Sequence, residues 1–249
     1  MIPLRDNNPV YRVPHVTYVL ITLNVLVYLY EVMLGSMRQP PSREFAIFII
    51  SYGAIPSEIV RVLLHPGQWF FYPMGTLFTS MFIHGGFWHL AGNMLFLYIF
   101  GDNIEDALGH VRFLVFYLAC GIAASAAHVG IDLIEALLGL SPISDIPMVG
   151  ASGAIGGIMG GYILLYPRAR VLSLVFFFFI TVVEIPALWF LGGWLVLQFL
   201  GGLNNIGAGS NVGGTAFWAH IGGFLMGMWL IRLWMKSRAY REQPRIWWE

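Results

Sequence analysis

Six long apolar segments constrain the fold of this chain more than any other feature of its sequence. A helix crosses the hydrocarbon core of a bilayer, about 30 Å thick, with roughly 20 apolar residues. Because a segment in lipid must satisfy its own backbone hydrogen-bonding groups, each segment is predicted to be a helix. The segments lie near residues 16–35, 83–104, 112–131, 150–166, 187–203 and 216–235. The predicted fold class is an all-α polytopic membrane protein with six transmembrane helices in one domain.

The composition supports a membrane location. Hydrophobic residues make up 58% of the chain and charged residues 10%, whereas about a quarter of the residues in an average soluble domain are charged. The 13 Lys and Arg residues balance the 13 Asp and Glu residues, so there is no basic excess to attract nucleic acid. We therefore expect the lipid bilayer, and no nucleic acid, as a partner. The one cysteine, Cys120, excludes an intramolecular disulfide.

The distribution of positive charge predicts the orientation of the chain. Short loops rich in Lys and Arg stay on the cytoplasmic side of a membrane. Three of the 13 Lys and Arg residues lie in the first loop: Arg38, Arg43 and Arg61. The other ten lie in regions that a six-helix chain places on one side of the membrane: before the first segment, between the second and third, after the fourth, and at and beyond the end of the sixth. Both termini are therefore predicted to be cytoplasmic, and the fourth and sixth segments to enter the membrane from its outer face.

The segments predict three regions along the chain. Residues 1–15 form a cytoplasmic N-terminal arm, residues 16–235 form the membrane domain, and residues 236–249 form a basic cytoplasmic tail. The first loop, about residues 36–82, is longer than most helix connections. Its aromatic residues suit the headgroup zone, either as a belt that anchors the fold or as a shelf beside the entrance to a site.

The stretch before the fifth segment does not continue a helix. Pro186 disfavours helical geometry in the residue before it, so residues 171–184 are predicted to be an interfacial or re-entrant stretch. Glu31, Asp102 and Glu184 lie near predicted helix ends, where we expect their side chains to reach the membrane interface.

Two polar residues stand at the beginning of apolar segments. Ser152 lies in Gly-Ala-Ser-Gly at residues 150–153, and His220 lies in Ala-His-Ile-Gly-Gly at residues 219–223. Ionisable groups at membrane depth are costly and by default indicate function. A histidine within hydrogen-bond reach can take the proton of a serine hydroxyl and make it a nucleophile. The pattern predicts that Ser152 is a nucleophile and His220 its base.

A third polar cluster opens the second segment. His84, His89 and Asn93 lie in His-Gly-Gly-Phe-Trp-His-Leu-Ala-Gly-Asn, and His89 and Asn93 share a helix face because they are four residues apart. Both side chains can donate to one oxyanion, together with the backbone N–H groups at the N-terminus of the Ser152 helix.

Glycines predict how these segments meet. Gly156 and Gly160 in the fourth segment, and Gly223 and Gly227 in the sixth, form small-xxx-small faces. Such faces allow membrane helices to approach closely. If the two faces meet, Ser152 and His220 lie at the same depth.

These ordered motifs, between Gly67 and Trp234, resemble those of the rhomboid family of intramembrane serine proteases. Phe-Gly-Asp-Asn-Ile-Glu-Asp at residues 100–106, with Gly109, also resembles the end of the family's second helix. The resemblance implies a dyad of the nucleophile Ser152 and the general base His220, and an oxyanion hole that includes Asn93 and His89. It further implies supporting roles for His84, Gly150, Gly153 and Gly223.

Two positions depart from the family pattern. Many relatives have Trp-Arg in the first loop, whereas here Phe70 follows Trp69. Some members place an aromatic residue four positions after the serine to stack on the histidine, and here that position is Gly156. The departures leave open how His220 is oriented and how the first loop supports the fold.

Membership of this family implies cleavage of transmembrane protein substrates near their outer end, without a metal or cofactor. The expected location is a bacterial plasma membrane, with the site open toward the outer face. One alternative is a catalytically inactive rhomboid-like binder, which would retain the fold and lose the serine or the histidine. A channel or transporter is another alternative, although the sequence has no convincing internal repeat. A zinc site at His84, His89 and His220 lacks the i, i+4 histidine spacing of His-Glu-x-x-His.

Overall fold

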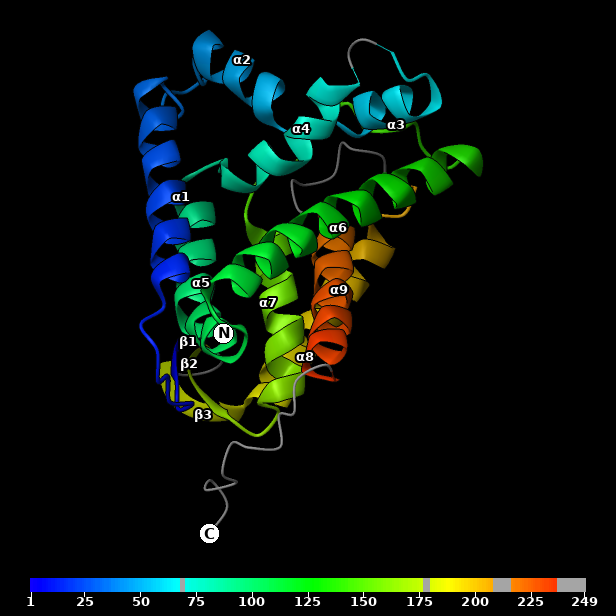
Figure 1. The fold of residues 1–249 in the computed structure, drawn as a ribbon. Coiled ribbons are helices and arrows are strands. Elements are labelled where there is room, and N and C mark those ends of the chain that lie inside the picture. Colours follow the sequence, from blue (N-terminus) through cyan, green and yellow to red (C-terminus); the bar gives the residue numbers. More distant parts are fainter. Residues whose placement is uncertain (68–69, 177–179, 208–215, 237–249) are drawn as a thin grey trace.

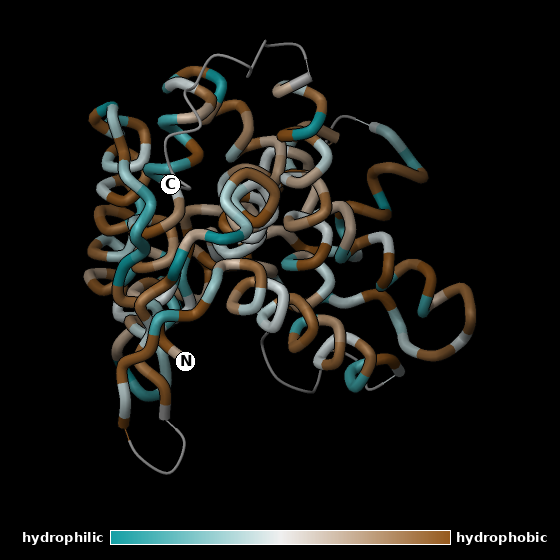
Figure 2. The backbone as a smooth tube through the Cα atoms, turned by 90° about the horizontal axis from the view of Figure 1, so that it is seen from below, coloured by the Kyte–Doolittle hydropathy of each residue, from teal (hydrophilic) through white to brown (hydrophobic). Residues whose placement is uncertain are grey.

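The computed structural model describes residues 1–67, 70–176, 180–207 and 216–236, and these residues are mostly helical. The long helices run between two ends of the molecule, with short helices at one end and a small sheet at the other (Figure 1). Hydrophobic residues dominate the long helices, and hydrophilic residues occur in short stretches (Figure 2). Trp69 lies outside the described residues.

Each of the six predicted apolar segments overlaps a long helix, and the boundaries differ by up to six residues. They are α1 (His15–Met33), α5 (Phe87–Leu108), α6 (His110–Leu137), α7 (Ser152–Leu165), α8 (Ala187–Asn204) and α9 (Phe217–Lys236). Within the described part of the chain, α1, α6 and α8 are long and apolar enough to cross a membrane, and α7 is a shorter apolar helix. The α5 helix ends in a polar turn with Asp102, Glu105 and Asp106, which lowers its mean hydropathy. The structure therefore contains the six helices, and three of them meet the length and hydropathy required of a span.

The first loop folds into short helices. They are α2 (Arg43–Tyr52), α3 (Pro56–Leu64), α4 (Phe71–Thr79) and the 3₁₀ turn η1 (Ser80–Phe82). Ser42 is the N-cap of α2, and its hydroxyl accepts a hydrogen bond from the N–H of Phe45. Pro56 occupies the first turn of α3, where its missing N–H costs nothing. The loop thus forms a helical layer at the end of the molecule opposite the sheet (Figure 1).

The all-α expectation needs one correction, because the chain also contains a three-stranded antiparallel sheet. Its strands, in the order β1-β2-β3, are β1 (Ile2–Asp6), β2 (Arg170–Phe176) and β3 (Ile180–Pro186). Leu172 pairs with Glu184 in the hairpin and with Arg5 in β1. The run of β-branched residues in Ile-Thr-Val-Val-Glu-Ile favours extended structure. As predicted from Pro186, helix α8 begins immediately after it, at Ala187.

Helix α7 occupies the centre of the helical bundle, in contact with α5, α6 and α9 (Figure 1). It is buried from Gly153 to Tyr162. A Cβ atom added to Gly223 would lie 1.9 Å from the carbonyl oxygen of Gly153, and one added to Gly227 would lie 1.9 Å from that of Gly157. A Cβ atom on Gly160 would lie 2.0 Å from the carbonyl oxygen of Phe224, so both predicted glycine faces lie at the contact between α7 and α9, whose backbones touch.

Two buried carboxylates tie α1 to the rest of the bundle. Glu105 of α5 accepts hydrogen bonds from the N–H groups of Val16 and Thr17 at 2.9 and 2.7 Å, which satisfies donors in the first turn of α1. Glu31, near the other end of α1, is fully buried and accepts a 3.0 Å hydrogen bond from the N–H of His84. The expectation that Glu31 reaches the interface is wrong, because this acceptor is needed inside the bundle. Asp102 is partly buried, whereas Glu184 is exposed.

Candidate active site

Ser152 is the first residue of α7 and follows a sharp turn. Gly150 has a φ of +123°, a conformation that side-chain-bearing residues rarely adopt. Its N–H donates to the carbonyl oxygen of Ser80 at 2.9 Å, which ties the turn to η1. Ser152 therefore stands at a helix N-terminus on a fixed turn, with backbone N–H groups around its hydroxyl.

His220, in the first turn of α9, contacts Ser152 directly. Its Nε2 lies 2.7 Å from the Oγ of Ser152, and its Nδ1 lies 2.7 Å from the Oε1 of Gln198. The serine hydroxyl can donate to Nε2 when Nδ1 carries the ring proton, and Nδ1–H then donates to the amide oxygen of Gln198. The geometry allows a neutral His220 to accept the hydroxyl hydrogen of Ser152.

His89 and Asn93 lie over the turn that precedes Ser152. A Cβ atom added to Gly150 would lie 2.7 Å from the Cε1 of His89, 2.8 Å from its Nε2 and 3.7 Å from the Nδ2 of Asn93. The two side chains therefore approach the backbone of Gly150 closely, on the side of α5. Within the described residues, the buried Nδ2 of Asn93 has no hydrogen-bond partner. A buried donor without an acceptor is available to a ligand oxygen.

His84 lies next to this cluster and does not contact Ser152. Its ring centroid is 5.1 Å from that of His89, with the rings nearly perpendicular. The ring nitrogens of His84 are buried and have no partner in the part of the chain that the structure describes. Its backbone N–H is held by Glu31. His84 thus packs against the ring of His89.

A small cavity of about 30 Å³ adjoins Ser152. The hydroxyl-bearing residues Ser80 and Ser125 line it with Ser152, and Gly150 and Gly153 form part of its wall. A space of this size accommodates a water molecule when polar partners are available. Ser152 therefore has beside it a small cavity that is mostly apolar and carries three serine hydroxyl groups.

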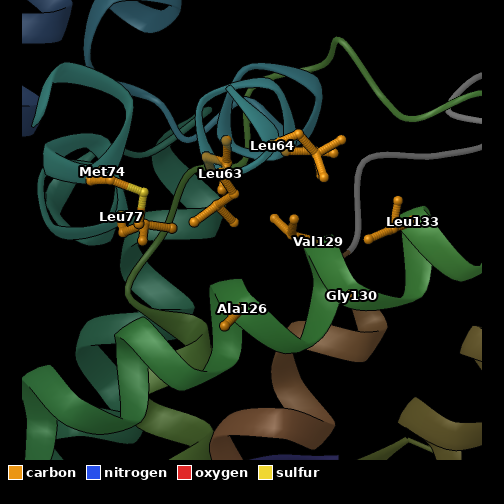
Figure 3. Close-up of a pocket in the computed structure, with 10 residues that line it drawn as sticks. Leu63, Leu64, Met74, Leu77, Ala126, Val129, Gly130 and Leu133 are labelled. Carbon is orange, nitrogen blue, oxygen red and sulfur yellow. The ribbon is translucent and has the colours of Figure 1, made fainter. Parts of the chain in front are cut away.

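A larger cavity, of about 210 Å³, lies between α3, α4 and α6 (Figure 3). Leu63, Leu64 and Met74 line one side, and Ala126, Val129 and Leu133 line the side of α6. Every lining residue is apolar or glycine, so this cavity offers no group for acid–base or nucleophilic chemistry. In the described residues, no three His, Cys, Asp or Glu side chains are grouped so that they can hold a metal ion.

The sequence analysis missed two residues of the site. Gln198 contacts the Nδ1 of His220, and the ring centroid of Trp194 lies 5.7 Å from that of His220. Both residues belong to α8 and are four positions apart. Gln198 is the one amide side chain within the apolar segment 187–203, and a polar residue in such a segment is a signal for function.

The fold and the site define a helical membrane protein with a serine and a histidine paired at the start of two packed helices. The rhomboid domain model matches residues 72–237, a range that includes His84, His89, Asn93, Ser152 and His220. The chain therefore belongs to the rhomboid family, and the resemblance in its motifs is confirmed.

Named relatives extend this finding. The chain is 30% identical over 168 residues to "Rhomboid protein 1, mitochondrial" of Saccharomyces cerevisiae, an alignment that covers 68% of this chain and 43% of the relative. It is 32% identical over 154 residues to rhomboid protease GluP of Bacillus subtilis, covering 61% and 24% of the two chains. It is 33% identical over 152 residues to rhomboid protease AarA of Providencia stuartii, covering 59% and 50%. The alignments thus span half or less of each relative's length.

Proposed function

We propose that this protein is an intramembrane serine endopeptidase that cleaves transmembrane segments of membrane proteins near their outer end. The observation that carries the proposal is the 2.7 Å contact between the Oγ of Ser152 and the Nε2 of His220. The family includes proteins named as proteases in two bacteria, GluP and AarA, which favours the same activity here.

The proposed reaction is acyl transfer through a Ser–His dyad. His220 Nε2 takes the hydroxyl proton of Ser152 as Oγ attacks the scissile carbonyl carbon, and a tetrahedral oxyanion forms. The imidazolium of His220 then gives this proton to the leaving amine as the C–N bond breaks. A water molecule, deprotonated in turn by His220, hydrolyses the acyl-enzyme and releases Ser152.

The oxyanion is proposed to lie in front of α7. The free Nδ2 donor of Asn93 and the ring of His89 approach the Gly150 turn from α5, and backbone N–H groups at Ser152 approach from α7. Donors that are fixed before the reaction stabilise charge that develops in the transition state without reorganisation. His84, Gly150, Gly153 and Gly223 are proposed to support this arrangement through packing.

Hydrolysis in a bilayer needs water at the serine. The cavity of about 30 Å³ beside Ser152 supports the proposal, because three serine side chains lie in its mostly apolar lining and it has room for one water molecule. The larger cavity between α3, α4 and α6 has no hydroxyl group in its lining.

Two other functions remain as alternatives. An inactive rhomboid-like binder would not need an intact dyad, and the contact between Ser152 and His220 favours catalysis over that role. A channel or transporter would leave the same contact without a purpose.

The topology is also a proposal. Six helices, α1, α5, α6, α7, α8 and α9, are proposed to span the membrane, with residues 16–235 as the membrane domain between a cytoplasmic arm at 1–15 and a cytoplasmic tail at 236–249. The sheet end is then cytoplasmic and the α2–α4 end faces outward. A bacterial plasma membrane is the proposed location, with the site open toward the outer face.

Cleavage of a tagged transmembrane substrate by the purified protein tests the activity. Wild type is compared with Ser152→Ala and His220→Ala, with a metal chelator in a parallel reaction and labelling by a serine-reactive fluorophosphonate. We expect chelator-resistant cleavage and labelling by wild type, and neither by the two variants. Cleavage that persists in Ser152→Ala would exclude this serine as the nucleophile, and a folded wild type that neither cleaves nor labels would favour the binder.

A further inference from the structure

Two residues of α8 contact the ring of His220, and one of them contacts the ring nitrogen that faces away from Ser152. The Oε1 of Gln198 lies 2.7 Å from the Nδ1 of His220. The indole of Trp194 lies over the same imidazole, with ring centroids 5.7 Å apart and planes inclined by 34°. Because residues four positions apart share a helix face, one stripe of α8 supplies both contacts.

Gly156 explains why this support comes from α8. A Cβ atom at position 156 would lie 2.8 Å from the carbonyl oxygen of His220, so α7 has no room there for any side chain. An aromatic residue four positions after the serine is therefore excluded by the close approach of α7 and α9. Trp194 covers the imidazole from a different helix.

The packing of α8 against α9 fixes the position of this stripe. A Cβ atom on Gly201 would lie 2.5 Å from the ring of Phe217, and one on Gly202 would lie 3.0 Å from the ring of Trp218. The rings of Trp194 and Phe224 also stack, with centroids 6.2 Å apart. These contacts, on both sides of Gln198 along α8, position its amide next to His220.

We propose that Gln198 is the positioning residue of the catalytic base, and that it selects the His220 tautomer in which Nδ1 carries the proton and Nε2 is free to accept from Ser152. Trp194 restricts rotation of the ring by covering its face. This inference rests on the proposed protease function. It assigns to a neutral amide the role that a carboxylate has in a Ser-His-Asp triad.

The polarity of the Gln198 amide decides the chemistry. With Oε1 toward Nδ1, the ring must donate there, and Nε2 remains an acceptor for the serine proton. With the amide NH₂ toward Nδ1, the ring would carry its proton on Nε2 and could only donate to Ser152. The second arrangement is not competent for general-base catalysis, so the tautomer of His220 tests the proposal.

Nitrogen-15 NMR of the histidine-labelled protein in detergent reads the tautomer without reference to cleavage. The chain has seven histidines, and comparison with His220→Ala assigns the signals of His220. We expect wild type to show a protonated Nδ1 and an unprotonated Nε2, and Gln198→Leu to shift the ring toward a mixture of tautomers. A wild-type ring protonated on Nε2, or an unchanged tautomer in Gln198→Leu, would overturn the proposal.

Kinetics provide the second measurement. Gln198→Leu is expected to lower kcat by about tenfold or more with KM nearly unchanged, because the ring is mispositioned for the chemical step alone.

Gln198→Glu retains an acceptor and should recover most of the kcat at high pH. The added carboxylate favours the imidazolium, so the acidic limb of the kcat/KM profile should move to higher pH. His89 on α5 and His128 on α6 also act electrostatically on His220. Both are present in every variant, so their effect on the pH profile cancels when the variants are compared.

The control is Leu197→Ala, on the neighbouring residue, which is 60% exposed. It should leave kcat, the pH profile and the tautomer unchanged. Thermal melts of all variants separate loss of fold from loss of positioning. Unchanged kcat in a folded Gln198→Leu would overturn the proposal. If wild type neither cleaves nor labels with fluorophosphonate, that result counts against the protease function, and the NMR measurement alone decides whether Gln198 sets the tautomer.

Discussion

The Oγ of Ser152 lies 2.7 Å from the Nε2 of His220, although the two residues are 68 positions apart in the chain. The contact depends on two helices that touch through their backbones. A Cβ atom on Gly223 would lie 1.9 Å from the carbonyl oxygen of Gly153, one residue after the serine. Because glycines have no side chains, the two helices approach closely enough for the hydroxyl of Ser152 to reach the imidazole of His220.

Gly227→Ala tests this packing at a distance from the dyad. Its Cβ would lie 1.9 Å from the carbonyl oxygen of Gly157, so α7 and α9 must separate. We expect a loss of stability of about 1–3 kcal/mol and reduced cleavage, measured by thermal unfolding in detergent and by the substrate assay. The control is Gly192→Ala, also in a helix, where a Cβ meets nothing within 4 Å. Equal stability of the two variants would show that the close approach is not needed.

Asn93→Ala is predicted to slow catalysis while the protein stays folded. The buried Nδ2 of Asn93 has no partner among the described residues, so its removal breaks no hydrogen bond that the structure records for that atom. If Nδ2 donates to the oxyanion, kcat should fall by roughly 10²–10³-fold with KM little changed. Steady-state kinetics and a thermal melt provide the check, and unchanged turnover would remove Asn93 from the oxyanion hole.

The sequence predicted the positions of the six long helices and the proximity of Ser152 to His220, because these features depend on local patterns. The length of an apolar run and the glycine spacing at Gly223 and Gly227 are readable from the chain, and so are the polar residues at membrane depth. The pairing of β1 with β2 was missed because the two strands are far apart in sequence. The β2–β3 hairpin was missed although its β-branched residues favour extended structure, because the apolar run was interpreted as an interfacial or re-entrant stretch. Gln198 was missed because its contact with His220 depends on how α8 packs against α9. Glu31 was misplaced because the N–H of His84, its partner, is 53 residues away.

Glu31→Ala is predicted to destabilise the fold. The carboxylate accepts the N–H of His84 at 3.0 Å in a buried environment, and without it this donor has no acceptor. An unsatisfied buried donor costs about 1–3 kcal/mol. Glu31→Gln retains an acceptor oxygen and should lose less. Chemical or thermal unfolding compares the two variants with wild type; a melt of Glu31→Ala that matches wild type would show that water replaces the carboxylate.

Asp6 gives a prediction for pH dependence. Burial between β1 and the bundle raises the pKa of its carboxyl above the ordinary value of 3.8, although hydrogen bonds from Tyr162 and Asn103 oppose the shift. The folded protein then binds this proton more tightly than the unfolded chain does. The stabilisation is complete below about pH 3.8 and is lost as the pH rises through the folded-state value. Asp6→Asn should remove this dependence, so that wild type loses stability relative to the variant as the pH is raised. If the difference in melting temperature between wild type and Asp6→Asn stays constant as the pH rises from about 3.8, the raised pKa of Asp6 is excluded.

The proposed topology can be tested with single cysteines, because the native Cys120 is buried and should react slowly. Tyr11→Cys lies in the N-terminal arm, where the tyrosine is 69% exposed. Arg61→Cys lies in α3 at the opposite end of the molecule, where the arginine side chain is 67% exposed. With the N-terminus in the cytoplasm, a membrane-impermeant maleimide should label position 61 in intact cells stripped of their outer wall, and position 11 only after lysis. The Cys120-only protein gives the background. Labelling of position 11 before lysis and of position 61 only after it would invert the orientation, and would then place the start of α7, with Ser152, toward the cytoplasm.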